Sequence, residues 1–304
     1  MVGKEYLSRY DLTYDQVLTT SEFDLKTPVS GLQSGNHLGE LVADAFLWTA
    51  QVLEAGTLDT KSVAVTADGV LRAPLLKGEI TVSEAFDVLS MGVGSDGTSG
   101  FPLVGVYLTG KELRAAAEVD ASVTPIMPAA QLYMSGMEYS FNTNRMFFNR
   151  VMSAKVHGEE IRDDQLYRVI TGMYSAQMLG TVKEKSMGLL SLEPKMADGT
   201  PVTDFNDCIL RDKDGNEIKE WYALAAYLNR WIDEDLSIPA DRYEAEHGDG
   251  RKVVSHSWDL KSMTTNLNGI SLAVCGLILV LILLAVLVIR FILRRVRRRR
   301  NRGK

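Results

Sequence analysis

The feature that most constrains this chain is a long uncharged run near its C-terminus. Residues 269–289 carry no charged side chain and read GISLAVCGLILVLILLAVLVI. As a helix this run measures roughly 30 Å, the thickness of the hydrocarbon core of a bilayer. Only a helix satisfies the backbone of a single segment in lipid, which offers no hydrogen-bond partner. The run predicts one membrane-spanning helix over residues 269–293, and a buried apolar hairpin is the alternative.

A strongly basic tail follows this run and indicates its orientation. The tail contains no acidic residue. Basic residues flank the cytoplasmic end of membrane spans, so residues 294–304 are expected in the cytoplasm and residues 1–268 outside the cell membrane, in a single-pass topology. Contact with nucleic acid or anionic lipid is the alternative, but the position directly after the apolar run favours the topological role. The basic residues are Arg290, Arg294, Arg295, Arg297, Arg298, Arg299, Arg300, Arg302 and Lys304.

The part of the chain before the run is acidic. The whole chain has 33 basic and 39 acidic residues, and nine of the basic ones lie in the tail. Residues 1–268 therefore hold 24 basic and 39 acidic residues, a net charge of −15. Such a charge keeps a domain soluble and excludes nucleic acid as its partner.

The cysteines and the N-terminus bear on where the protein is located and on what precedes this chain. Cys208 stands alone before the apolar run and Cys275 lies within it, so no disulfide framework and no CxxC metal site is expected. This usage fits a bacterial extracytoplasmic protein with few disulfides. The first residues, MVGKEYLSRYDLTYDQ, contain no apolar core of a signal peptide. We therefore expect a leader and a further domain upstream of Met1.

Hydrophobic periodicity predicts one mixed α/β domain between a linker and a stalk. Residues 1–34 are polar and are interpreted as a linker, residues 35–238 as the domain, and residues 239–268 as a polar stalk. Asn36 and Gly56 are expected to cap the first helix. Helices are predicted from 37 to 56 and over 82–89, 111–120, 173–183 and 221–235, and strands over 63–66, 103–108, 131–142, 150–157 and 167–171.

Three short motifs bear on chemistry. Gly35–Asn36–His37 resembles one metal-binding element of two-metal phosphoesterases, but the DxH, GDxxD and GHxH partner elements are absent, so a helix cap is the simpler interpretation. Residues 91–100, MGVGSDGTSG, lack the GK[ST] of a phosphate-binding P-loop and indicate a surface loop. Residues 212–216, DKDGN, fit a hairpin turn better than a calcium loop. No metal site or cofactor is expected in this chain.

Several segments together resemble the C-terminal domain of the 5′-nucleotidase family. They read HLGELVADAFLW, VAVTADGVLRAPLLKGEITVSEAFDVLSMG, VYLTGKELRAAAE, QLYMSG and LYRVITGMYS, and they keep the family's order over about residues 36–235. The longer runs resemble a membrane-anchored bacterial branch. The resemblance implies a single domain of that mixed α/β fold followed by one transmembrane helix. It also implies an upstream metallophosphoesterase domain that holds divalent metal ions and performs the hydrolysis.

The resemblance implies only part of a nucleotide site. The family stacks the base between two aromatic rings, and these positions fall on Met91 and Tyr174. The phosphate-binding arginine is retained as Arg72, whereas the family asparagine falls on Ala67. The ribose-binding aspartate falls near Gly180. Either the ligand differs from an ordinary nucleotide, or the site has lost its function.

Two functions of different classes follow. The first is the substrate-binding-type domain of a membrane-anchored 5′-nucleotidase-like phosphoesterase acting in nucleotide catabolism. Its partners would be the lipid bilayer, a nucleotide or nucleoside-like ligand and the upstream domain, and this chain alone would not be catalytic. The second is a non-catalytic cell-surface interaction or spacer module with a decayed nucleotide site. A wrongly started or broken reading frame is a third explanation of the missing metal ligands.

Overall fold

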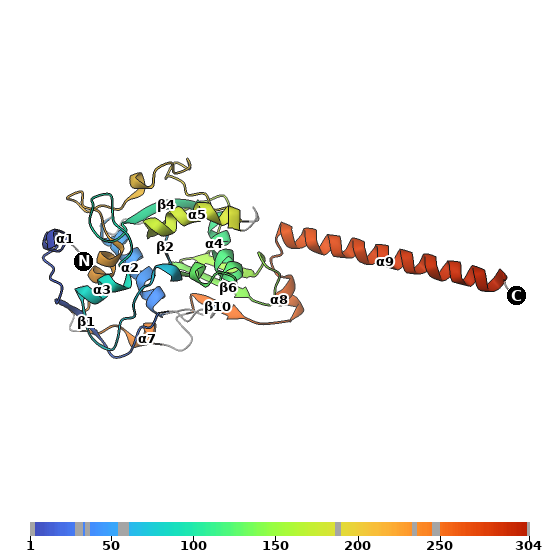
Figure 1. The fold of residues 1–304 in the computed structure, drawn as a ribbon, viewed down its shortest axis with the longest axis horizontal. Coiled ribbons are helices and arrows are strands. Elements are labelled where there is room, and N and C mark those ends of the chain that lie inside the picture. Colours follow the sequence, from blue (N-terminus) through green and yellow to red (C-terminus); the bar gives the residue numbers. More distant parts are fainter. Residues whose placement is uncertain are drawn as a thin grey trace.

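A computed structural model of the chain describes residues 4–27, 33, 37–53, 61–185, 190–232, 236–244 and 250–302. A mixed α/β domain is followed by one long helix that leaves it at one end (Figure 1). The helices are α1 (Lys4–Arg9), α2 (His37–Leu53), α3 (Val82–Val88), α4 (Gly110–Val123), α5 (Met173–Lys185), α6 (Glu220–Asn229), α7 (Ala240–Tyr243), α8 (Leu260–Thr264) and α9 (Gly269–Arg302). The strands are β1 (Val17–Ser21), β2 (Ser62–Ala67), β3 (Gly78–Thr81), β4 (Leu103–Thr109), β5 (Leu132–Ser135), β6 (Met137–Asn142), β7 (Val151–Val156), β8 (Glu159–Glu160), β9 (Leu166–Gly172) and β10 (Lys252–Ser255).

A four-stranded mixed sheet forms the centre of the domain, in the order β4-β9-β2-β5. The inner strands β2 and β9 are parallel, and β4 and β5 pair antiparallel on either side of them. One face of the sheet packs against α2, α3 and α6, and the other against α4 and α5. Burial on both faces explains why β2 reads as the nearly continuous apolar run SVAVTA.

The predicted helix starts agree with the structure to within one residue. Thr81 caps α3 and Thr109 caps α4, and each is part of a reciprocal capping box with the glutamate three residues later, Glu84 or Glu112. Helix α2 begins at His37 as predicted. The proposed caps Asn36 and Gly56 lie outside the described residues.

Two predicted elements differ from the structure. Residues 131–142, predicted as one strand, form β5 and β6, because Gly136 between them has a φ of 76° that interrupts the extended chain. The interruption sends β6 into a second sheet, β10-β6-β7-β8. The helix predicted over 221–235 is α6, which ends at Asn229, and residues 233–235 lie outside the described part of the chain.

The described part of the predicted linker 1–34 packs into the domain. Tyr6, Leu18 and Leu25 are fully buried in the same core cluster as α2 and α6. Strand β1 pairs antiparallel with β3. A few apolar side chains spaced along a polar segment are thus enough to attach it to the domain. The sequence predicted a linker because the mean hydropathy of the segment is low.

The predicted stalk 239–268 is also attached to the domain. Strand β10 pairs in parallel with β6. Its neighbour Arg251 is buried and donates two hydrogen bonds to Asp44 of α2, at 2.9 and 3.1 Å. Lys252 lies 2.7 Å from the buried carboxylate of Asp120. The sequence predicted a solvated stalk because the segment is polar. Its basic residues Arg251 and Lys252 in fact pair with the buried acids Asp44 and Asp120, which lie far away in the sequence.

Helix α9 runs away from the domain (Figure 1). Its residues Ser271–Arg295 contain an 18-residue window with a mean hydropathy of 3.5 and are long and apolar enough to cross a membrane. The large apolar side chains along this stretch are exposed instead of packing on the domain.

Candidate functional site

A cavity of about 460 Å³ lies between the glycine-rich loop and the start of α5. This volume is within the range of small-molecule sites in proteins. One wall is loop 91–101, and another is the short 3₁₀ helix Phe205–Cys208. The lining residues are Val93, Gly94, Ser95, Phe101, Pro102, Met173, Gln177, Thr203, Asp204, Phe205 and Asn206.

Two aromatic rings line this cavity. Phe101 lies at its edge and stacks on Tyr174 of α5, with ring centroids 5.9 Å apart and planes 22° apart. Phe205 lines it from the 3₁₀ helix. A base inserted between two rings needs about 7 Å, which is twice the rise between stacked bases. The pair Phe101–Tyr174 is therefore too close to enclose a base, and the free wall of the cavity offers Phe101 and Phe205 instead.

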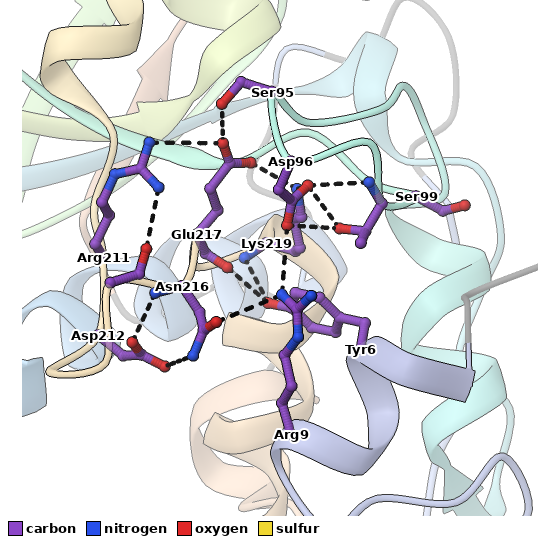
Figure 2. A network of polar contacts seen from close by, with 12 residues as sticks. Tyr6, Arg9, Ser95, Asp96, Ser99, Arg211, Asp212, Asn216, Glu217 and Lys219 are labelled. Carbon is purple, nitrogen blue, oxygen red and sulfur yellow. Dashed lines mark hydrogen bonds and ion pairs between the residues drawn. The ribbon is translucent and has the colours of Figure 1, made fainter.

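Loop 91–101 is a small hairpin held by a buried polar network (Figure 2). Ser95 Oγ donates a hydrogen bond to the Glu217 carboxylate. The Lys219 ammonium lies 2.7 Å from Glu217 Oε2 and 2.7 Å from Asp96 Oδ1. Tyr6 Oη donates to the Glu217 carbonyl oxygen at 2.8 Å, which joins α1 to the same network. The loop is thus fixed to residues from the C-terminal part of the domain, and through them to α1 near its N-terminus.

The charges of this network are balanced within it. The side chains of Lys219 and Glu217 are fully buried. Lys219 is compensated by Glu217 and Asp96, and Glu217 by Lys219 and by Arg211, whose guanidinium lies 3.7 Å away. Burial by itself would raise the pKa of the Asp96 carboxyl, but hydrogen bonds from Lys219 and Thr98 lower that pKa below its ordinary value. An ionised Asp96 is therefore the form that holds the loop.

Directly behind the loop lies a buried acid of a different kind. Glu220, the first residue of α6, donates its backbone N–H to the carbonyl oxygen of Phe101. Its Oε1 is buried with no hydrogen-bond partner among the described residues. Burial raises the pKa of this carboxyl to about 8. The carboxyl fills the space beside Gly172, where a Cβ atom would lie 1.7 Å from Glu220 Oε1.

The three residues predicted as substrate contacts lie in different settings. Tyr174 is 37% exposed and stacks on Phe101. Met91 is half-buried against the core, and its carbonyl oxygen accepts the Phe101 N–H at 2.9 Å. Arg72 is exposed, and its backbone N–H bonds to Val88 at the end of α3. Phe101 thus contacts both Met91 and Tyr174, but none of the three predicted residues is among those that line the cavity.

Sequence reasoning missed Phe101 and Phe205. Phe101 follows the glycine-rich loop and precedes β4, and an aromatic residue at the mouth of a strand was a usable signal. Phe205 comes from a 3₁₀ helix that Asp204 caps, and no periodic pattern marks so short an element. Only the tertiary structure brings it to the cavity.

Within the described residues there is no group of three or more His, Cys, Asp or Glu side chains able to hold a metal ion. Of the Gly35–Asn36–His37 motif only His37 is described, and it begins α2 with Nδ1 4.0 Å from Glu40. The predicted turn at residues 212–216 is confirmed. Asp212 accepts backbone hydrogen bonds from Asp214 and Asn216, and Gly215 has a φ of 84°.

Comparison with known proteins places this chain in one family. The model of the 5′-nucleotidase C-terminal domain matches residues 16–182, more than half of the chain. The chain belongs to this family. It is 31% identical over 143 residues to the trifunctional nucleotide phosphoesterase YfkN of Bacillus subtilis, a match that covers 45% of this chain and 9% of that protein.

A solved structure shares the fold. The 5′-nucleotidase precursor from Thermus thermophilus superposes with a TM-score of 0.56 at 24% identity, over 83% of this chain and 42% of that one. The NAD nucleotidase of Haemophilus influenzae gives a TM-score of 0.49 at 16% identity, over 83% of this chain and 40% of that one. The chain thus spans less than half the length of these relatives.

Proposed function

We propose that this chain is the substrate-binding-type domain of a membrane-anchored 5′-nucleotidase-like phosphoesterase, and that an upstream two-metal domain supplies the hydrolysis. The family membership supports the domain's role, and the partial coverage of its relatives is compatible with an upstream domain. The observation that carries the proposal is the cavity beside Phe101, lined by two aromatic rings and several polar groups.

The cavity suits the parts of a nucleoside. Phe101 and Phe205 offer apolar ring faces, on which a purine or a pyrimidine can stack. Asp204, Asn206 and Gln177 offer hydrogen-bond acceptors and donors for sugar hydroxyls and base edges. The exposed Arg72 would reach only a phosphate that extends out of the cavity. Stacking on one or two rings supports weak binding, with a dissociation constant on the order of a millimolar.

In a titration followed by chemical shifts, AMP and adenosine are expected to bind the full chain in detergent weakly. Phe101→Ala is expected to weaken the binding of both ligands by about fivefold or more, because a stacked ring contributes about 1–3 kcal/mol per base. Arg72→Ala is expected to weaken AMP and leave adenosine unchanged.

Trp258→Ala is the matched control for this titration, because it removes an exposed aromatic residue that lies outside the cavity. The proposed cavity would be refuted if the ligand-induced chemical-shift changes were the same in Phe101→Ala as in the native chain. It would also be refuted if Trp258→Ala reduced them as much as Phe101→Ala.

The membrane topology gives a second test. In intact cells that export the protein, with Cys208 and Cys275 replaced by serine, a membrane-impermeant thiol reagent is expected to label Asp164→Cys. The same reagent is expected not to label Asn301→Cys. Asp164 is exposed on the domain and Asn301 lies in the basic tail. The expected result follows from the positive-inside bias of the tail, and the reverse labelling would place the domain in the cytoplasm.

Two observations favour the alternative, a surface module whose nucleotide site has decayed. Phe101 and Tyr174 stack on each other instead of leaving room for a base, and Ala67 replaces a family asparagine. Absence of any chemical-shift change at several millimolar ligand would support this alternative over the binding domain.

A further inference from the structure

The end of the domain next to α9 presents a tryptophan to solvent. Trp258 is 76% exposed, and Leu260, two residues later, is also 76% exposed. The chain has four tryptophans, and Trp221 and Trp231 are buried while Trp48 is half-buried. Two large apolar side chains this exposed and this close in sequence indicate a surface that meets another apolar phase.

The segment that carries these side chains is held firmly to the domain. Asn142 Nδ2 donates to the Ser257 carbonyl oxygen at 2.7 Å, just before Trp258. Asp259 caps α8 by accepting the Ser262 N–H at 3.1 Å. The exposure of Trp258 therefore belongs to an ordered segment, which displays the side chain in a defined place.

The same segment is tied to the domain again just before α9. Arg145 Nη2 donates to the Thr265 carbonyl oxygen at 2.6 Å, and Asn266 Nδ2 donates to Met152 at 2.6 Å. The Asn268 N–H donates to Asn149 at 2.8 Å, and α9 begins at the next residue. Figure 1 shows α8 at the end of the domain from which α9 leaves. If α9 crosses a bilayer, α8 lies at the end of the domain that faces the membrane.

The charge of the segment points to an apolar contact. Residues 257–264 contain one acid, Asp259, and one base, Lys261. The domain as a whole is acidic, so attraction to anionic headgroups cannot hold it. A tryptophan with a neighbouring leucine suits the boundary between headgroups and acyl chains, where amphipathic rings are enriched in membrane proteins.

We propose that Trp258 and Leu260 form a membrane foot, a pair of side chains inserted into the bilayer interface on the domain's side of the membrane. The foot and the first residues of α9 together give the domain two points of attachment, so the domain keeps one orientation on the membrane surface. This inference rests on the proposed membrane span of α9.

The test uses the full chain in phosphatidylcholine vesicles whose acyl chains carry bromine, which quenches nearby tryptophan fluorescence. The fluorescence of Trp258 is obtained as the difference in fluorescence intensity between the native chain and Trp258→Ala. We expect bromine placed high on the acyl chain to lower this signal about twofold or more, and bromine near the chain end to lower it less. The quenching is expected to persist at high salt, and Leu260→Ser is expected to reduce it.

A matched control places the only exposed tryptophan at the opposite end of the domain. Leu76 is exposed and lies just before β3, which pairs with β1 far from α9 (Figure 1). Leu76→Trp in the Trp258→Ala chain is expected to show no added quenching. Quenching at both positions, or quenching that high salt abolishes, would overturn the foot.

Flotation of the vesicles after an alkaline wash separates this inference from the proposed span. A chain that floats with the vesicles but leaves Trp258 unquenched keeps the span and refutes the foot. A chain that the wash removes from the vesicles refutes the span, and the foot with it.

Discussion

Lys219→Met is expected to lower the free energy of unfolding by about 3–5 kcal/mol, the usual effect of removing one partner from a buried ion pair. The substitution removes the buried cation of the fully buried Glu217 carboxylate and leaves it only the half-exposed Arg211, 3.7 Å away. It also removes the hydrogen bond to Asp96, which holds loop 91–101 against the domain. Urea unfolding of the full chain in detergent, followed by tryptophan fluorescence, measures the change.

Lys77→Met is the control for this prediction. Lys77 pairs with Glu22 at 3.3 Å, but both side chains are mostly exposed, so the expected change is below about 1 kcal/mol. The double variant Glu217→Gln/Lys219→Met is expected to be more stable than Lys219→Met, because no carboxylate stays buried at position 217 without its lysine partner. Equal stability of Lys219→Met and the native chain would show that the network does not support the fold.

Glu220→Gln is expected to stabilise the chain by about 3 kcal/mol at pH 7. Burial raises the pKa of the Glu220 carboxyl to about 8 in the folded chain, against an ordinary value of 4.5. The folded state therefore binds a proton that the unfolded state releases between these two values. The contribution of Glu220 to the free energy of unfolding is therefore fully present below pH 4.5 and is lost as the pH rises towards about 8. Glutamine keeps the shape of the protonated acid and removes this dependence.

Urea unfolding between pH 4.5 and 8 checks the prediction, with Glu79→Gln as the control. Glu79 is exposed on β3, and its replacement is expected to leave the pH dependence of stability unchanged. Parallel stability curves for the native chain and Glu220→Gln would show that Glu220 finds a partner or solvent in the folded state.

The position of Glu220 links this acid to the cavity. Its backbone N–H holds Phe101, whose ring lines the cavity. Ionisation of a buried carboxyl without a partner favours any rearrangement that admits water. Loop 91–101 ends at Phe101 and is held by Lys219, so the two stability predictions concern the same wall of the cavity.

Part of the fold follows from local sequence, because local signals decide it. The capping boxes at Thr81 and Thr109, the periodic apolar face of α2 and the β-branched run of β2 each act within a few residues. The apolar run of α9 is likewise a property of consecutive residues. These elements lie where the sequence predicts them.

The site and the outer limits of the domain depend on residues far apart in the chain. Arg251 reaches Asp44, Tyr6 reaches Glu217, and Phe205 reaches the cavity of Phe101 only after the sheet has formed. A polar segment that neutralises buried acids has the same composition as a solvated linker, so residues 1–34 and 239–268 were indistinguishable from linkers. The sequence by itself determined the family, the central elements and the apolar helix. The tertiary structure decided which charges are buried and which rings form the cavity, because burial and pairing depend on contacts that no local pattern records.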